Sequence, residues 1–346
     1  MAEIDTRIRK MRRCLNAAAA LSVMATIASL VAMTAFVSTS ARQVAAKESD
    51  KRSPFMLEGV AKYEVFNFPT PAVAEILCAS AAVSKDGREG LRWDRVMAAG
   101  KVRLPINRSL IVNLRFDGLE KLASLDCLKK CQVREFSAEA LDFEDKHIPY
   151  LKAFQTLEVG DFNDTLITDA SLPALASFPK MGALRLVKTN VTGVGFDHLK
   201  GMKHLTELKL EGSNIKPGLI FKLKSLMPTM TNLNLARISI TKEDTAILKS
   251  LRDIKYLNLS SNTNVDDNTM KYLSGMNELF NLALDDTSVT EKSLPILVKL
   301  PKLRNVIVRD KTFWKSKNHK TKIGNVVFTD CQTTSNAPPD VFSPLH

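Results

Sequence analysis

A pair of leucines recurs along this chain with a period that few folds accommodate. In each copy two core residues flank a single variable one, and the first of them stands at Leu184, Leu208, Leu233, Leu257, Leu282 and Val306. Successive copies are 24 or 25 residues apart. A fixed period of this size is typical of chains that stack one structural unit on the next, because a single unit cannot bury its own apolar face.

One repeat predicts a short strand, a turn and a helix. In LTELKLEGSNI (205–215) the two leucines of L-x-L point to one side of a strand and the residue between them points to the other. A polar turn follows, and Ile215 re-enters the core. The second half, as in TEKSLPILVKL (290–300), begins with Thr290 as N-cap and carries apolar residues at helical spacing. Stacked copies therefore predict parallel strands on one side and helices on the other.

This pattern resembles the leucine-rich-repeat family, L-x-x-L-x-L-x-x-N-x-L, in its longer form with a full helix in each repeat. The resemblance covers about residues 110–330, with degenerate copies upstream such as FQTLEVG (154–160). Repeat endings such as TNVT and TSVT are similar to those of bacterial members. The resemblance implies an α/β fold, a leucine-rich-repeat solenoid or horseshoe with a concave parallel sheet and convex helices.

The turn of each repeat departs from the family pattern at its inward position. Where the family usually carries Asn or Cys, this chain has Thr189, Ser213, Ile238, Asn262 and Thr287. Isoleucine has no side-chain group that can hydrogen-bond to the turn. We therefore expect the repeat that contains Ile238 to be looser than its neighbours.

A calcium loop is the main alternative reading of the most polar turn. In LNLSSNTNVDDNTMKYL (257–273) Asn262, Asn264, Asp266 and Asn268 alternate like oxygen ligands. An EF-hand that started at Asn262 would need Gly at its sixth position and Glu at its twelfth. The chain has Asp267 and Leu273 there. The stretch thus predicts a polar turn, with one extra residue as a bulge after Leu259, and a helix start.

The N-terminal segment is apolar enough to cross a membrane. No charged side chain occurs between Arg13 and Arg42, and the core 15–37 would reach about 34 Å as a helix, against a hydrocarbon thickness of about 30 Å. We expect an uncleaved transmembrane anchor over residues 14–40. Five cations precede it, so the positive-inside rule keeps residues 1–13 in the cytoplasm and sends the repeats across the membrane.

A cleaved signal peptide is the competing interpretation, and it would give a secreted protein. Thr39 and Ala41 offer a small-residue cleavage site, although the apolar part of a signal peptide is normally about 7–15 residues long. Residues 41–109 predict a linker and a membrane-proximal cap with a short helix in 71–84, and residues 331–346 predict a disordered tail. The disulfide state of the exported cysteines stays open. These cysteines are Cys78, Cys127, Cys131 and Cys331.

The expected concave face is the candidate binding site. Its central column reads Glu158, Arg185, Lys209, Asn234, Asn258, Ala283 and Ile307. Asparagine side chains both donate and accept hydrogen bonds, which suits a peptide ligand. The residues chosen for a partner-binding site on this face are Arg185, Lys209, Asn234, Tyr256, Asn258, Asp285 and Arg309.

The chain is therefore predicted to be a non-catalytic protein-binding or scaffolding module with a protein or peptide ligand. Of the formal net charge of +12, residues 1–13 supply +3 and the remaining +9 is spread thinly, so we expect no nucleic-acid partner. No catalytic residue, metal ligand or cofactor is predicted, and a small enzymatic activity in residues 42–109 is the remaining alternative. The sequence does not indicate an oligomeric state.

Overall fold

The computed structural model describes residues 61–83, 89–226, 229–308, 313 and 322–329. The chain divides into two compact units, 1–58 and 59–346, and only the second contains described residues. The predicted anchor at 14–40, the predicted tail at 331–346 and Arg309 lie outside the described residues. Within the described ranges, no helix has both the length and the apolar character needed to cross a membrane.

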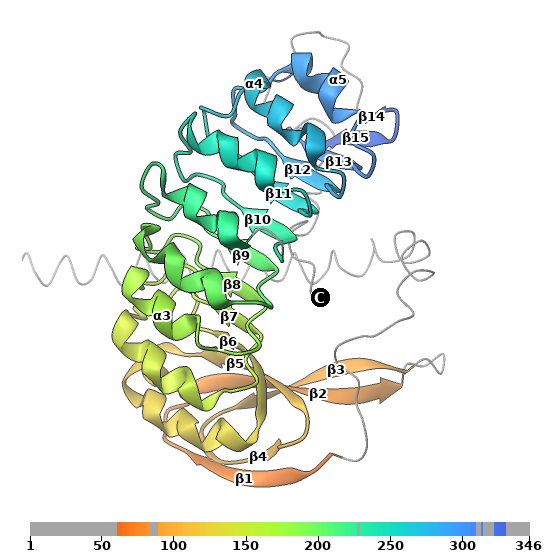
Figure 1. Ribbon diagram of the computed structural model, residues 1–346. Coiled ribbons are helices and arrows are strands. Elements are labelled where there is room, and N and C mark those ends of the chain that lie inside the picture. The colour runs from red at the N-terminus through yellow and green to blue at the C-terminus, as the bar shows by residue number, and fades with distance from the viewer. Residues whose placement is uncertain (1–60, 84–88, 227–228, 309–312, 314–321, 330–346) are drawn as a thin grey trace, which may run out of the picture. The chain divides into compact units, whose positions relative to one another are not determined.

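A single thirteen-stranded sheet runs through the second unit, and its middle strands are parallel and follow one another in chain order (Figure 1). The parallel strands are β5 Ser109–Leu114, β6 Gln132–Ser137, β7 Val159–Asp161, β8 Ala183–Arg185, β9 Glu207–Lys209, β10 Asn232–Asn234, β11 Tyr256–Asn258, β12 Asn281–Ala283 and β13 Asn305–Ile307. At one end β15 (Val326–Thr329) pairs parallel to β13, and β14 (Lys322–Ile323) pairs antiparallel to β15.

The strand register confirms the predicted repeat alignment. Leu184 pairs with Leu208, and the series continues through the other predicted core positions to Val306. All of these side chains are buried and belong to one continuous apolar core. The prediction of a parallel sheet built from L-x-L strands is therefore confirmed.

The helical side differs from the prediction. Short helical segments line one side of the row of strands, and most of them are 3₁₀ rather than full α-helices (Figure 1). A 3₁₀ helix rises about 2.0 Å per residue, so it crosses the back of a repeat with fewer residues than an α-helix needs. The segments are η1 Phe116–Lys130, η2 Asp145–Ala153, η3 Asp169–Ser171, α3 Leu172–Leu175, η4 Val194–Gly201, η5 Leu219–Leu226, η6 Asp244–Ser250, α4 Asp267–Met270, η7 Lys271–Gly275, η8 Glu291–Ser293 and α5 Leu294–Leu297.

Antiparallel strands precede the repeats, and the predicted short helix in 71–84 is wrong. That stretch forms the strand β2 (Ala74–Val83), which pairs with β3 (Glu89–Met97) and, over its first half, with β5. Ala74, Ile76 and Cys78 are buried at alternate positions, which is the period of a strand. A separate pair, β1 (Tyr63–Phe68) and β4 (Gly100–Pro105), completes this part.

Each turn after the strands β6 to β12 contains a residue with positive φ. This residue is four positions after the first core residue, as at Lys188, Gly212, Arg237, Ser261 and Asp286. Left-handed backbone is unfavourable for residues other than glycine. In compensation, the amide at this position donates to the next repeat, for example from Ser261 to the Asp285 carbonyl at 2.7 Å. These bonds continue the stacking beyond the short strands.

Carboxylates join neighbouring repeats on the helical side. Asp169 accepts hydrogen bonds from the Thr192 amide (2.8 Å) and hydroxyl (2.7 Å) in the next repeat, and also from the amides of Gly193 and Gly195. Asp267 accepts in the same way from the amide and hydroxyl of Thr290. A carboxylate in the first turn of one helical segment thus fixes the start of the next one.

Candidate binding face

The strand face, the side of the parallel sheet away from the helical segments, carries the predicted site residues in ordered columns. Its central column, read from the register, is Ser137, Asp161, Arg185, Lys209, Asn234, Asn258, Ala283 and Ile307. The flanking column is Glu135, Val159, Ala183, Glu207, Asn232, Tyr256, Asn281 and Asn305. Four of the predicted site residues therefore lie in the central column, and Tyr256 lies in the flanking column. The four are Arg185, Lys209, Asn234 and Asn258.

The first residue of the predicted central column was wrong. Glu158 was expected beside Arg185, but the residue that pairs with Arg185 is Asp161. Gly160 takes the core position that leucine holds in the later repeats. A Cβ at Gly160 would lie 2.8 Å from the ring of Phe162, so that ring already fills the space of a leucine side chain. Glu158 instead lies just before β7 and pairs with Arg134.

Arg185 is held by carboxylates rather than left open to a partner. Its Nε donates to Glu207 Oε1 at 3.0 Å, and its Nη1 lies 3.4 Å from Asp161 Oδ2 and 3.5 Å from Glu135 Oε1. Only 12% of the Arg185 side chain is exposed. Burial alone would lower the pKa of Arg185, but the negative charges of Glu207, Asp161 and Glu135 outweigh it and raise that pKa.

Lys209 belongs to the same group of charges, although more loosely. Its Nζ is 3.9 Å from Glu207 Oε1, and the side chain is largely buried. Three carboxylates thus surround one guanidinium and one ammonium, so the group has an excess of one negative charge. The sequence did not indicate Glu135 and Asp161 as part of the site. The 24-residue spacing continues upstream to Gly160 and Phe136, but neither residue is a leucine, so the L-x-L pattern does not mark these repeats.

Asparagines dominate the next strands of the face. Asn234 donates from Nδ2 to Glu211 (3.1 Å) and accepts at Oδ1 from the Ala236 amide. Asn258 accepts at Oδ1 from the Ser260 amide, and no described residue accepts from its Nδ2. In the flanking column, Asn305 donates to Asn281. In both Asn234 and Asn258 a backbone amide therefore fixes the position of the side-chain oxygen. This in turn fixes the direction in which the side-chain NH₂ group points.

One aromatic pair lies beside these asparagines. The rings of Tyr256 and Phe280 have their centroids 6.3 Å apart and are tilted by 58°. Phe280 is 40% exposed and Tyr256 is half-buried. Asp285, also half-buried, follows β12 at the position that Ser260 holds after β11. The face thus changes along the sheet from ionic side chains at β6–β9 to amides with an aromatic edge at β10–β12.

Polar residues of the 257–273 stretch form hydrogen bonds within the turn and at the start of the following helix. Asn262 is buried and makes four hydrogen bonds to backbone groups. Asp266 caps α4 through the Thr269 amide at 2.9 Å. The turn and helix-start interpretation is correct. The extra residue lies between Asn262 and Val265, however, and not after Leu259, because Ser261 keeps the usual left-handed position.

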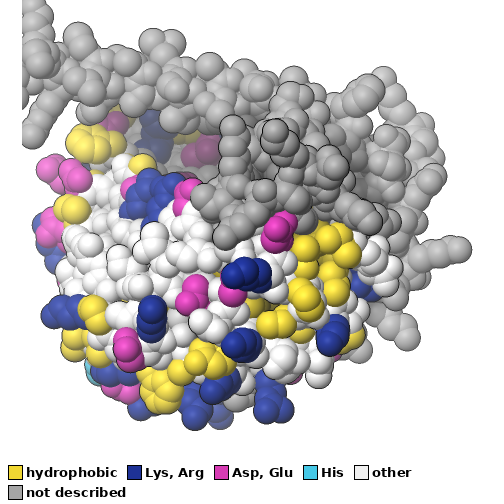
Figure 2. Space-filling model, turned by 90° about the horizontal axis from the view of Figure 1, so that it is seen from above, with side chains coloured by type: hydrophobic (Ala, Val, Ile, Leu, Met, Phe, Trp, Pro, Cys, Tyr) yellow, Lys and Arg dark blue, Asp and Glu magenta, His cyan; other side chains and the backbone are white. Residues whose placement is uncertain are grey.

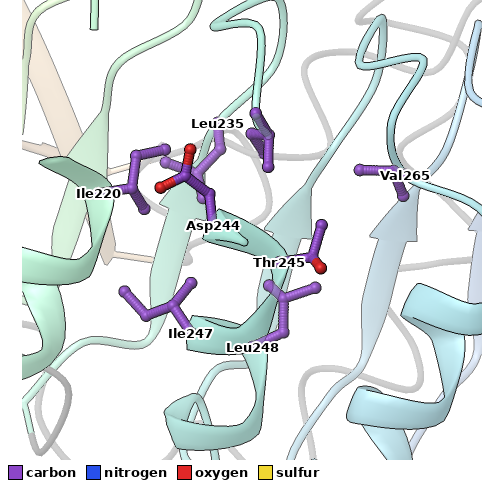
Figure 3. Close-up of a pocket in the computed structure, with 8 residues that line it drawn as sticks. Ile220, Leu235, Asp244, Thr245, Ile247, Leu248 and Val265 are labelled. Carbon is purple, nitrogen blue, oxygen red and sulfur yellow. The ribbon is translucent and has the colours of Figure 1, made fainter. Parts of the chain in front are cut away.

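A narrow gap lies under η6, apart from the strand face. It is lined by aliphatic side chains from three repeats, with Asp244 among them (Figure 3). The gap has no room for a water molecule. Asp244 Oδ2 accepts from Thr241 and from the Gly218 amide, whereas Oδ1 is buried without a hydrogen-bond partner. This gap belongs to the packing of the repeats and offers no ligand volume.

The fold and the face together define a stacked-repeat solenoid with a polar sheet surface. No family model and no curated protein sequence matches the chain. Among solved structures, it is similar to the internalin InlF of Listeria monocytogenes, with 19% identity, a TM-score of 0.38 and coverage of 58% of this chain and 47% of that one. The chain therefore spans about half the length of that internalin.

Two further likenesses come from eukaryotes. The mouse RP105/MD-1 complex is 17% identical, with a TM-score of 0.40 and coverage of 53% of this chain and 35% of that one. The plant peptide hormone receptor RGFR1 in complex with RGF2 is 13% identical, with a TM-score of 0.35 and coverage of 60% and 30%. These structures are leucine-rich-repeat proteins. At such identities and TM-scores the likenesses say nothing of this chain's function.

Proposed function

We propose that this chain is a non-catalytic protein-binding module whose strand face holds an extended segment of a protein partner. The observation that carries the proposal is the unbroken register from β6 to β13, which lines up polar side chains of successive repeats on one side of the sheet. Repeat solenoids present extended surfaces of this kind, and their length suits a long, shallow contact rather than a small enclosed ligand.

The chemistry of the face favours a polypeptide ligand. The Nδ2 group of Asn258 in β11 and the exposed ring of Phe280, just before the neighbouring strand β12, offer a donor and an apolar contact. The ionic group around Arg185 lies a few strands away and carries both signs of charge. Figure 2 likewise shows basic and acidic side chains intermingled over the surface seen from above. A polyanion such as nucleic acid would instead favour a surface of a single sign.

Site-specific photo-cross-linking tests this proposal in the cells that make the protein. The photoreactive amino acid benzoylphenylalanine replaces Tyr256 or Asn258 on the strand face. In matched controls it replaces Asn214 or Val298, which are exposed away from that face. We expect a discrete cross-linked protein from the strand-face positions alone. Adducts from the control positions alone would contradict the proposed binding face.

We further propose that residues 14–40 anchor the chain in a membrane, with residues 1–13 in the cytoplasm and the repeats outside. The uninterrupted apolar stretch and its basic flank support this arrangement. We expect the intact chain to stay in the membrane pellet after alkaline carbonate extraction, and its repeats to be digested by protease added outside spheroplasts or cells. N-terminal sequencing gives the control: a mature start near Arg42 would establish the secreted alternative instead.

A further inference from the structure

The hairpin formed by β2 and β3 extends beyond the rest of the sheet. Ala74–Cys78 of β2 pairs with β5, but the pairing of β2 with β3 continues through Ala79 and Trp93 to Val83 and Glu89. In its outer half the hairpin is therefore a two-stranded ribbon with no third strand among the described residues (Figure 1). A ribbon of two strands is only marginally stable in water without further pairing or packing.

The outer edge of β3 has the features of a strand that pairs with another. β3 is the last strand of the sheet, and in the described ranges it pairs only with β2. Its nine residues, EGLRWDRVM, contain no proline, and their register with β2 is continuous. Proline, bulges and short length are common ways by which proteins block edge pairing. The remaining protection is charge, and here the charges have both signs.

We propose that the edge of β3 pairs antiparallel with the same edge of a second copy of this chain, around a twofold axis at Trp93. A twofold axis at Trp93 places Arg92 opposite Asp94 of the second copy, and Asp94 opposite Arg92 of the second copy. Directly opposite residues in an antiparallel pair lie on the same side of the sheet, where unlike charges stabilise the pair. The interface is then isologous, as a closed dimer requires.

The charge sequence selects this register over its neighbours. An axis at Arg92, Asp94 or Arg95 would place that charge opposite itself. An axis between two adjacent residues is not possible, because it would place residues from opposite sides of the strand against each other. Like charges directly opposite each other destabilise a strand pair. The axis at Trp93 avoids all these contacts, and it also brings the two Trp93 residues together, a type of aromatic cross-strand pair that adds stability.

The ion pairs already present in the hairpin are compatible with this arrangement. Arg92 Nε lies 2.8 Å from Asp94 Oδ1 within β3, and both side chains are substantially exposed. In the dimer each arginine would therefore lie between two aspartates, one on each strand. Arg95 is bound to Glu75 of β2 at 2.8 Å, which neutralises the charge of Arg95 within the hairpin. Charge complementarity of the segment with itself is what identifies the partner as a second copy.

Charge exchange in the full-length chain tests the proposal. The dimer dissociation constant is measured by sedimentation velocity in a density-matched detergent for wild type, Arg92→Asp, Asp94→Arg and the double variant. Each single variant places two like-charge contacts at the interface, so we expect dissociation constants raised about fivefold or more. The double variant restores both contacts and should return to within about threefold of wild type. Lys101→Asp, an exposed change on β4, should leave the value unchanged.

Cross-linking fixes the register independently of affinity. With a short thiol-reactive cross-linker, Trp93→Cys should give a covalent dimer through residue 93 of both copies, as mapped by mass spectrometry. Val96→Cys, which lies opposite Gly90 of the second copy, should not cross-link to itself. Circular dichroism confirms that each variant is folded. A wild-type chain that stays monomeric at all concentrations, or a double variant as weak as the single ones, would overturn the proposal.

Discussion

Asn262 shows how one side chain can serve two repeats. Its Nδ2 donates to the carbonyls of Leu259 and Ser260 in its own turn and of Leu235 in the preceding repeat, and its Oδ1 accepts from the Ile240 amide. The repeat with Ile238 was expected to be looser because it lacks a polar inward residue. Asn262 supplies the missing hydrogen bonds across the repeat boundary, an arrangement that the residues of a single turn cannot indicate.

We therefore expect Asn262→Ala to be among the most damaging turn substitutions. Without the amide, several buried backbone groups lose their hydrogen-bond partner, which costs about 2–4 kcal/mol of the free energy of unfolding. Urea denaturation gives the value. Asn264→Ala is the matched control, since Asn264 is exposed and donates a single bond to the Ile240 carbonyl. Equal losses from the two substitutions would contradict the role assigned to Asn262.

Arg185 was chosen from the sequence as a binding residue, and its contacts also give it a structural role. Arg185→Met would leave Glu135, Asp161 and Glu207 close together without their common cation. Removing one partner from a buried ion network typically costs about 3–5 kcal/mol. We expect a loss near the lower end of that range, because Lys209 still faces Glu207. Unfolding by urea measures it, and Lys188→Met, at an exposed ion pair, should cost less than about 1 kcal/mol.

The two buried cysteines, Cys78 and Cys131, are expected to be slow to react. Burial, with a smaller contribution from Asp94, raises the pKa of Cys78 to about 11. Burial, with smaller contributions from neighbouring thiols and Glu64, raises the pKa of Cys131 to about 12. The thiolate is the reactive form, so both thiols should resist iodoacetamide at pH 8 in the folded protein and react after denaturation. Mass spectrometry of the labelled peptides checks this. Rapid labelling of the native chain would contradict the described burial.

At the scale of elements, the sequence predicted the strands better than the helices. An L-x-L strand is a local pattern, because alternation alone decides which side chains enter the core. The helical segments are set by how far each repeat must reach across its neighbours, which yields short 3₁₀ turns where full helices were expected. In 71–84 the Ala, Ile and Leu residues fit both periods. Pairing with β3 and β5, which lie later in the chain, makes this segment a strand.

The carboxylates that join the helical segments should make stability depend on pH. Burial would raise the pKa of Asp169, but hydrogen bonds from Thr192, Gly195 and Gly193 outweigh it and lower that pKa. The folded pKa is therefore below the unfolded value of about 3.9. The stabilisation by this carboxylate is complete above the unfolded value and is lost as the pH falls through the folded pKa.

Asp169→Asn isolates this effect. The amide would turn donor atoms toward the amides of the next repeat, so we expect a loss of about 1–2 kcal/mol at pH 7, after allowance for the partial exposure of the site. The difference from wild type should shrink at pH 3, where the native carboxylate begins to take up a proton. Urea denaturation at both pH values measures it, with Asp253→Asn, an exposed position, as control. A difference independent of pH would contradict the assignment.

At the scale of the whole molecule, regularity decides how much of the binding face the sequence reveals. From Arg185 onward the period is constant, so Lys209, Asn234 and Asn258 were placed in the same column by counting alone. Upstream, the core position is occupied by Gly160, and a count based on leucines misplaced Glu158. Glu135 and Asp161 join the Arg185 group through ion pairs between repeats. Such contacts depend on side-chain geometry, which a period cannot supply.

The stacking of the repeats in one dimension predicts how far a destabilising substitution affects the stability of other repeats. Each repeat contacts mainly its neighbours, so a cavity should weaken the repeats next to it. Leu208→Ala removes a fully buried side chain between Leu184 and Leu233 and should cost about 3 kcal/mol. Phe328→Ala in β15 should cost a similar amount at the end of the sheet. Native-state hydrogen exchange, read by mass spectrometry, gives the protection of each repeat.

We expect Leu208→Ala to reduce protection on both sides, through β8, β9 and β10. Phe328→Ala lies one strand from the end of the sheet, with only β14 beyond it, so its effect should be confined to β13, β14 and β15 and leave the Arg185 group protected. The two variants are matched in burial and in the type of change, and they differ in their position along the sheet. If both variants lowered protection equally from β5 to β15, the described unit would unfold as one block. The nearest-neighbour description of its stability would then be wrong.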